Sequence, residues 1–103
     1  MTTKTPSAAD LSARILEFIA TAVDCLDNTN FANDRPVYTQ DLAVAARWLV
    51  RLHRGESVRE VAQTISSAAS GKILTDYYRQ GEWGKKHNAA VAVLQAAASA
   101  FTV

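Results

Sequence analysis

Apolar residues recur at helical spacing along successive stretches of this 103-residue chain, and this periodicity limits the fold more than any other feature. In the first stretch the recurring residues are Leu11, Ile15, Phe18, Ile19, Ala22 and Leu26. Apolar residues never alternate with polar ones over a long run, and no hairpin turn is visible, so nothing favours a strand. We therefore predict an all-α fold, a compact bundle of four to five helices.

Capping residues and glycines set the expected helix ends. Ser7 and Ser57 each precede an acidic residue three positions later, as in a capping box, and Thr39 is a suitable N-cap. Gly55 and Gly81 are expected to end helices as left-handed C-caps. The expected helices span about residues 8–26, 40–54, 57–69, 72–80 and 85–100.

The length fits a single domain over residues 1–103 with one modest core, and residues 1–6 are expected to form a flexible tail. Cys25 lies at the edge of the first apolar stripe and is interpreted as a small buried side chain. We expect Phe31 to anchor the loop over 27–36 to the core. The predicted core consists of Leu11, Ile15, Phe18, Ile19, Leu42, Leu49, Leu52, Val61, Ile65, Leu74, Tyr77, Val91 and Leu94.

Composition excludes several classes of protein. With 49% hydrophobic and 20% charged residues, the chain does not have the composition of a disordered protein. Its start has no signal-peptide pattern, and no run approaches the ~20 apolar residues of a membrane span. Cys25 is the single cysteine, so no internal disulfide can form. We expect a cytoplasmic protein that makes no use of a membrane.

Charge is divided unevenly along the chain. Residues 1–45 carry three cations and six acids, net −3, whereas residues 46–103 carry eight cations and four acids, net +4. Such asymmetry indicates either a basic binding face or mutual attraction of the halves, within the fold or across a dimer. The whole chain has a net charge of only +1, which favours attraction between the halves.

Two expected helices are apolar around most of their circumference. The helix over 40–54 leaves a narrow polar strip of Arg47, Arg51 and Arg54, so it is predicted to be a central helix. The last helix is rich in alanine and nearly as apolar. A bundle this small encloses only one helix fully, and surplus apolar surface is typical of an association site. We therefore expect a homodimer or a helical partner that packs on the last helix.

Cationic residues supply the candidate binding sites. Spacings of four and three place Arg47, Arg51 and Arg54 on one helical face, suited to an acidic partner, although a solvated polar strip explains the same pattern. A second group occupies YYRQGEWGKKH, residues 77–87. There Trp83 is interpreted first as a hydrophobic staple, and the candidate partner- or anion-binding residues are Arg79, Trp83, Lys85 and Lys86. Lys85 and Lys86 are expected in the first turn of the last helix, where cations are disfavoured.

Residues 54–83 resemble the generic helix-turn-helix pattern, with Val61, Ala62 and Ile65 at the apolar positions of its first helix. The two helices would span about 57–69 and 72–80. The side chains available to DNA would be Lys72, Thr75 and Arg79. The turn departs from the pattern because glycine arrives late, at Gly71, and the near-neutral charge is unlike that of most DNA-binding domains.

His53 and His87 both fall on apolar helix faces, which is more typical of structural histidines than of ligands or catalysts. Neither has a second ligand at helical spacing, and no nucleophile has an evident base, so we expect no metal, no cofactor and no catalytic residue. A small enzyme using His53 or His87 stays as a remote alternative.

The sequence is thus best interpreted as a non-enzymatic helical protein-interaction module. We expect it to be regulatory and bacterial in type, and to act through helix packing as a homodimer or with a helical or acidic partner. A helix-turn-helix DNA-binding regulator is the alternative hypothesis.

Overall fold

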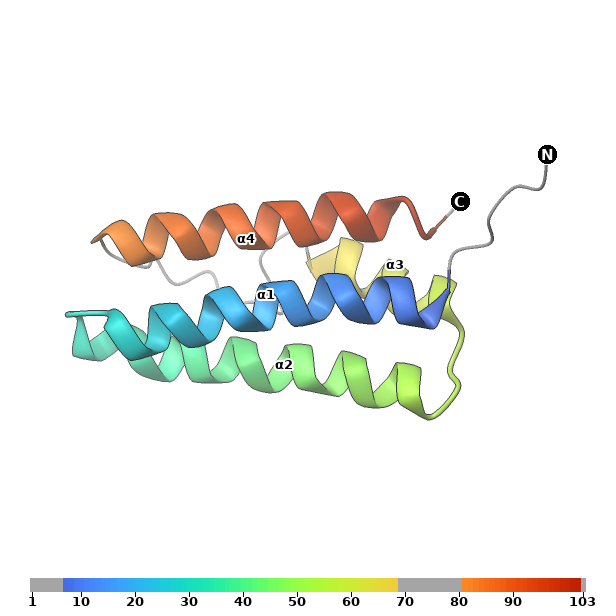
Figure 1. Ribbon diagram of the computed structural model, residues 1–103, viewed down its shortest axis with the longest axis horizontal. Coiled ribbons are helices and arrows are strands. Elements are labelled where there is room, and N and C mark those ends of the chain that lie inside the picture. The colour runs from blue at the N-terminus through green and yellow to red at the C-terminus, as the bar shows by residue number, and fades with distance from the viewer. Residues whose placement is uncertain (1–6, 69–80, 103) are drawn as a thin grey trace.

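Helix α1, over Ala8–Asn28, runs through the middle of the bundle and packs along both α2, over Arg35–His53, and α4, over Gly81–Ser99 (Figure 1). The chain, known here from a computed structural model, is described over residues 7–68 and 81–102. Both long neighbours run antiparallel to α1. Every regular element in these ranges is helical, which confirms the predicted all-α, single-domain fold.

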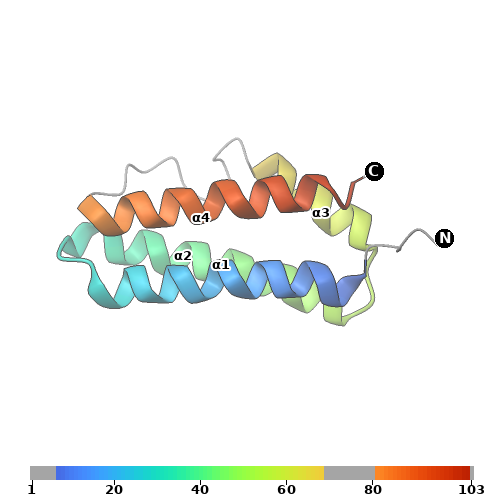
Figure 2. The same ribbon diagram turned by 45° about the horizontal axis from the view of Figure 1, so that its top comes forward.

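The short helix α3, over Val58–Ala68, closes one side of the bundle near the C-terminal end of α4 (Figure 2). The hydroxyls of Ser66 and Ser99 lie 3.4 Å apart across this contact. A single 3₁₀ turn, η1, over Ala32–Asp34, joins α1 to α2. No helix in the described ranges is long and apolar enough to cross a bilayer.

Three predicted helix ends are confirmed by the local geometry. The Ser7 hydroxyl accepts the backbone N–H of Asp10 at 3.1 Å, and the Ser57 hydroxyl accepts that of Glu60 at 3.3 Å. Each contact satisfies an N–H that the first helical turn leaves unpaired. Gly55 ends α2 with φ of +85°, in the left-handed region that glycine enters without steric cost.

Two predicted starts are too late. Helix α2 begins at Arg35 instead of Gln40, because Pro36 falls in its first turn, where proline is tolerated. Thr39 is consequently inside the helix, and its hydroxyl donates to the Arg35 carbonyl at 3.0 Å. Helix α4 begins at Gly81 instead of Lys85, so Gly81 opens this helix with φ of +75°. The predicted helix over 72–80 lies outside the described residues.

The core largely follows the predicted stripes. Leu11, Ile15, Phe18, Leu52, Val61, Ile65 and Leu94 are buried, and Ile19, Leu42, Leu49 and Val91 pack against them while partly exposed. Cys25 is buried as expected. Leu74 and Tyr77 lie outside the described residues. Phe31 is a correction: its side chain is 40% exposed and lies over Gly81 at the start of α4 instead of entering the core.

Helix α2 is not the enclosed central helix that its composition suggests. Its inner side buries Tyr38, Ala45 and Trp48, but its outer side leaves Val50 44% exposed together with the exposed Ala46. A helix with alanine and valine on its outer side looks apolar all round in sequence, even when one side faces solvent. The central position among the described helices belongs to α1, which packs against two long helices and also contacts α3, while its own outer side is exposed.

Candidate functional site

The outer surface shared by α1 and α2, here called the α1/α2 face, carries three exposed large apolar side chains. Leu16 is 53% exposed, Val23 is 46% exposed and Val50 is 44% exposed. Leu16 and Val23 are seven residues apart, so they lie on the same side of α1. The exposed Ala46 lies four residues before Val50 on the same side of α2.

Helical geometry shows that these side chains point away from the other helices. Arg14 and Phe18 line a cleft against α4, whereas Leu16 stands about 160° around α1 from Arg14. On α2, Arg51 reaches α3 through a 3.2 Å hydrogen bond to the Thr64 hydroxyl. Val50 stands about 100° around the helix from Arg51, turned away from α3. Because α1 and α2 pack side by side, their outer sides form one continuous surface.

Opposite charges border this surface. On α1, Glu17 and Asp24 lie seven residues apart on the side away from α2, and Asp10 belongs to the same series; these three residues form the acidic edge. On α2, Arg47 and Arg54 lie seven residues apart on the side away from α1 and form the basic edge. The α1/α2 face therefore passes from an acidic edge, across an apolar centre, to a basic edge.

A shallow groove of about 420 Å³ runs along the basic edge between Val50 and the arginines at positions 47, 51 and 54. Arg51 is already engaged, since its Nε donates to Glu56 Oε1 at 2.9 Å. Arg47 and Arg54 are exposed and form no ion pair with residues 7–68 or 81–102. The three arginines predicted to share a face do so, but within residues 7–68 and 81–102 Arg51 is paired while Arg47 and Arg54 are not.

The second predicted cationic group lies apart from this ridge, at the start of α4. Lys86 forms an ion pair with Glu82 at 3.4 Å, and its Nζ lies 4.1 Å from the centroid of the Trp83 ring. Trp83 is partly buried, and its carbonyl accepts a hydrogen bond from Cys25 Sγ at 3.3 Å. Lys85 is exposed, and both lysines follow the first turn because the helix starts at Gly81. Their predicted first-turn position is therefore wrong.

The remaining predicted contacts cannot be placed, because Lys72, Thr75 and Arg79 lie outside the described residues. The first helix of the predicted helix-turn-helix does form, as α3. Its buried side consists of Val61, Ala62 and Ile65, the residues that the pattern indicated.

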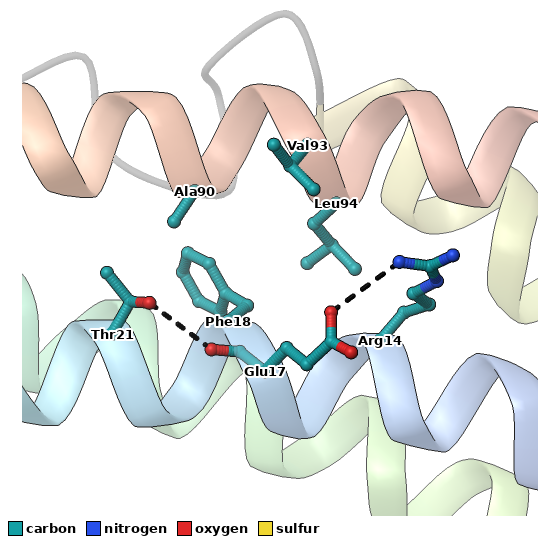
Figure 3. A pocket seen from close by; sticks show the side chains of 7 residues that line it. All are labelled: Arg14, Glu17, Phe18, Thr21, Ala90, Val93 and Leu94. Atoms are coloured by element: carbon teal, nitrogen blue, oxygen red, sulfur yellow. Dashed lines mark hydrogen bonds and ion pairs between the residues drawn. The ribbon is translucent and has the colours of Figure 1, made fainter.

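A second hollow lies between α1 and α4 (Figure 3). It measures about 180 Å³, and Phe18 and Leu94 point into it from opposite helices, with Val93 beside them. Arg14 and Glu17 stand at its mouth as an exposed ion pair at 3.6 Å. The apolar interior and the small volume suit a single aliphatic side chain better than a cofactor.

The two histidines lie at opposite ends of the bundle. His53 ends α2 and is exposed, contrary to its predicted place on an apolar face. His87 is fully buried, and its Nε2 lies 2.9 Å from Asp41 Oδ2. The rings of Phe18 and Tyr38 pack against it, with centroids at 5.4 and 4.9 Å. Both members of this histidine–carboxylate pair are therefore enclosed within the bundle.

Sequence reasoning missed three buried polar residues, of which Tyr38 and Asp41 contact His87. Tyr38, Asp41 and Asp34 are all fully buried, yet the predicted helix began after Tyr38 and took no account of an acid on its inner side. The available signal was the spacing of Tyr38, Asp41, Ala45 and Trp48, which places both polar residues on the inner side of one helix. Within the described residues no group of three or more histidine, cysteine or acidic side chains is arranged to hold a metal ion.

Comparison with models of known families, with curated proteins and with solved structures found no match for this chain.

Proposed function

We propose that this chain is a non-enzymatic protein-interaction module that works by helix packing and forms a homodimer through the α1/α2 face. The observation that supports the proposal is the exposure of Leu16, Val23 and Val50 on one face, bordered by edges of opposite charge. Exposed apolar patches with a polar rim are typical of protein–protein contacts.

The apolar centre of this face can drive association. Full burial of a valine or leucine side chain contributes about 1.5–3 kcal/mol, and these side chains are about half exposed. Each copy brings three such side chains, so covering them in both copies offers several kcal/mol toward the cost of association. A face with both an acidic and a basic edge also complements itself, which favours a second copy over an unrelated partner.

Helix α4 supports association less well than its composition suggests. Among the described residues, Val93 is the one large apolar side chain that α4 exposes, and the rest of its outer side is mostly alanine. Alanine allows close approach of helices but buries little area for each residue. We therefore move the expected interface from the last helix to the α1/α2 face.

The experiment compares Leu16→Asp with Val93→Asp by sedimentation velocity or light scattering at tens of micromolar protein. Both changes put one carboxylate at an exposed apolar position, 53% exposed for Leu16 and 57% for Val93, so their effects on the folded monomer should be alike. We expect the unmodified chain and Val93→Asp to be dimers and Leu16→Asp to be a monomer. Circular dichroism would verify that both variants remain helical.

Two outcomes would overturn the proposal. One is an unmodified chain that is monomeric at this concentration. The other is the reverse pattern, in which Val93→Asp dissociates the dimer and Leu16→Asp does not, because that result would place the interface on α4.

A further inference from the structure

We infer that the two-fold axis of the dimer runs along the bundle, so that α1 of each copy lies antiparallel on α2 of the other, with Glu17 opposite Arg47. This inference rests on the proposed dimer and specifies its arrangement. It follows from the order of charge across the α1/α2 face and from the seven-residue spacing of the charged residues on both helices.

Symmetry leaves two principal ways to place this face on itself. A two-fold axis that lies in the interface can run along the helices or across them. With the two-fold axis across the helices, each acidic edge would meet the acidic edge of the second copy, and each basic edge would meet a basic edge. With the two-fold axis along the helices, each acidic edge covers the basic edge of the second copy. Like charges that face each other weaken association, so the charge order selects the axis along the bundle.

One alignment of α1 on α2 of the second copy pairs the charged residues of both edges. In an antiparallel helix pair, a step of seven residues backward on one helix matches a step of seven forward on the other, about 10.5 Å at 1.5 Å per residue. Placing Glu17 opposite Arg47 therefore brings Asp10 opposite Arg54 without further adjustment. The same register sets Leu16 over the helical turn that contains Ala46 and Val50. One alignment thus satisfies the charged edges and covers the apolar centre.

The present contacts of Glu17 and Arg47 allow them to pair across the dimer. Glu17 pairs with Arg14 at 3.6 Å, and the two side chains are 65% and 51% exposed, so this pair is weak and easily replaced. Arg47 makes no ion pair in the described part of the chain. Arg51, in contrast, is held by Glu56 and Thr64. The arrangement therefore assigns the intermolecular contact to Arg47 and leaves Arg51 within its own copy.

The test is a charge exchange between positions 17 and 47, with the dimer dissociation constant measured by sedimentation equilibrium at low salt. We expect Glu17→Arg and Arg47→Glu each to weaken the dimer by about 10-fold or more, because every change creates two like-charge contacts across the two-fold axis. The double variant, with both changes in one chain, should recover an affinity near that of the unmodified chain. Added salt should reduce all of these differences.

The control is Glu17→Arg combined with Arg51→Glu. It has the same net charge as the double variant and differs in which arginine is replaced. We expect no recovery in this control, since Arg51 lies about 40° further around α2, toward α3. All the changed side chains are at least partly exposed, so the variants should fold.

The outcomes separate this inference from the proposed function. Single variants that keep the affinity within about 3-fold of the unmodified chain, a factor worth about 0.6 kcal/mol, would overturn the arrangement while the dimer itself stands. Equal recovery in the control would also overturn it, since only net charge would then matter. An unmodified chain that stays monomeric would overturn both.

Discussion

The two ends of the bundle contain the same kinds of residue in different surroundings. At the end where α2 and α4 begin, His87 pairs with Asp41 at 2.9 Å, and both side chains are fully buried. At the end where α2 stops, Arg51 pairs with Glu56 at the same 2.9 Å, but these side chains are 31% and 42% exposed. Each end also has a histidine and a glycine with positive φ: His87 and Gly81 at one end, His53 and Gly55 at the other.

The burial of these residues, and not the distance between the paired atoms, should decide how much each contributes to the stability of the fold. A buried pair that loses one partner leaves the other polar group without water, which is costly, whereas water compensates an exposed pair. The same contrast applies to glycine, because a new Cβ at Gly55 would meet nothing within 4 Å, while one at Gly81 would lie 2.9 Å from Phe31 Cε2. The first end is therefore expected to stabilise the fold, and the second to tolerate change.

The largest difference is expected between the histidines. His87→Ala should lower the free energy of unfolding by about 3–5 kcal/mol, because the buried Asp41 loses its contact with His87 and a cavity replaces the ring that packs on Phe18 and Tyr38. His53→Ala should change it by less than about 0.5 kcal/mol, since His53 is exposed. Urea unfolding followed by circular dichroism measures both.

A double-mutant cycle with Asp41→Ala sharpens this prediction. If His87 and Asp41 act as one pair, the double variant should lose less stability than the sum of the single variants, by about 1–3 kcal/mol. Strictly additive losses would show that the pair contributes through its volume alone.

Substitutions of the two glycines should differ less in the free energy of unfolding that they cost. Gly55→Ala should cost about 1 kcal/mol, which reflects only the left-handed backbone. Gly81→Ala should cost about 2 kcal/mol, because Phe31 must also move away from the new methyl group. Thermal or urea unfolding of the two variants provides the comparison. In a Phe31→Ala background, Gly81→Ala should cost no more than Gly55→Ala. Equal costs in the original background would indicate that the Phe31 ring moves freely.

The exposed ion pair of Arg51 and Glu56 should contribute the least to the stability of the fold. A double-mutant cycle on Arg51→Ala and Glu56→Ala should yield a coupling energy of about 0.2–1 kcal/mol, reduced by added salt. These measurements belong at a protein concentration where the variants have the same oligomeric state. A coupling energy as large as that of the His87–Asp41 pair would remove the contrast between the two ends.

Local patterns predicted the helices well wherever one signal was sufficient. The caps at Ser7 and Ser57, the stop at Gly55 and the buried side of α3 all follow from short-range chemistry. The start of α2 was missed because Pro36 indicates a break but is also accepted in a first turn. The start of α4 was missed because a glycine such as Gly81, with positive φ, is accepted at the end of a helix and also as its first residue.

The candidate interface was less predictable than the helices. The sequence places Arg47, Arg51 and Arg54 on one side of a helix. It does not show that Arg51 turns to α3 while the other two form no ion pair with the described part of the chain. Leu16 and Val23 lie outside the apolar stripe predicted for the first helix, but the sequence does not show that they lie beside Val50 on one exposed surface. Exposure depends on which neighbours cover each side of a helix, and α1 and α2 cover each other on only one side.

The sequence by itself determined the helical class, most helix ends and the residues suited to burial, because these depend on periodicity and on hydrogen bonds within a few residues. The tertiary structure decided that α1 occupies the central position, that His87 meets Asp41 and that the α1/α2 face lies open. Each of these depends on residues far apart in the chain, and the free energy that selects their arrangement comes from packing the whole bundle rather than from any single helix.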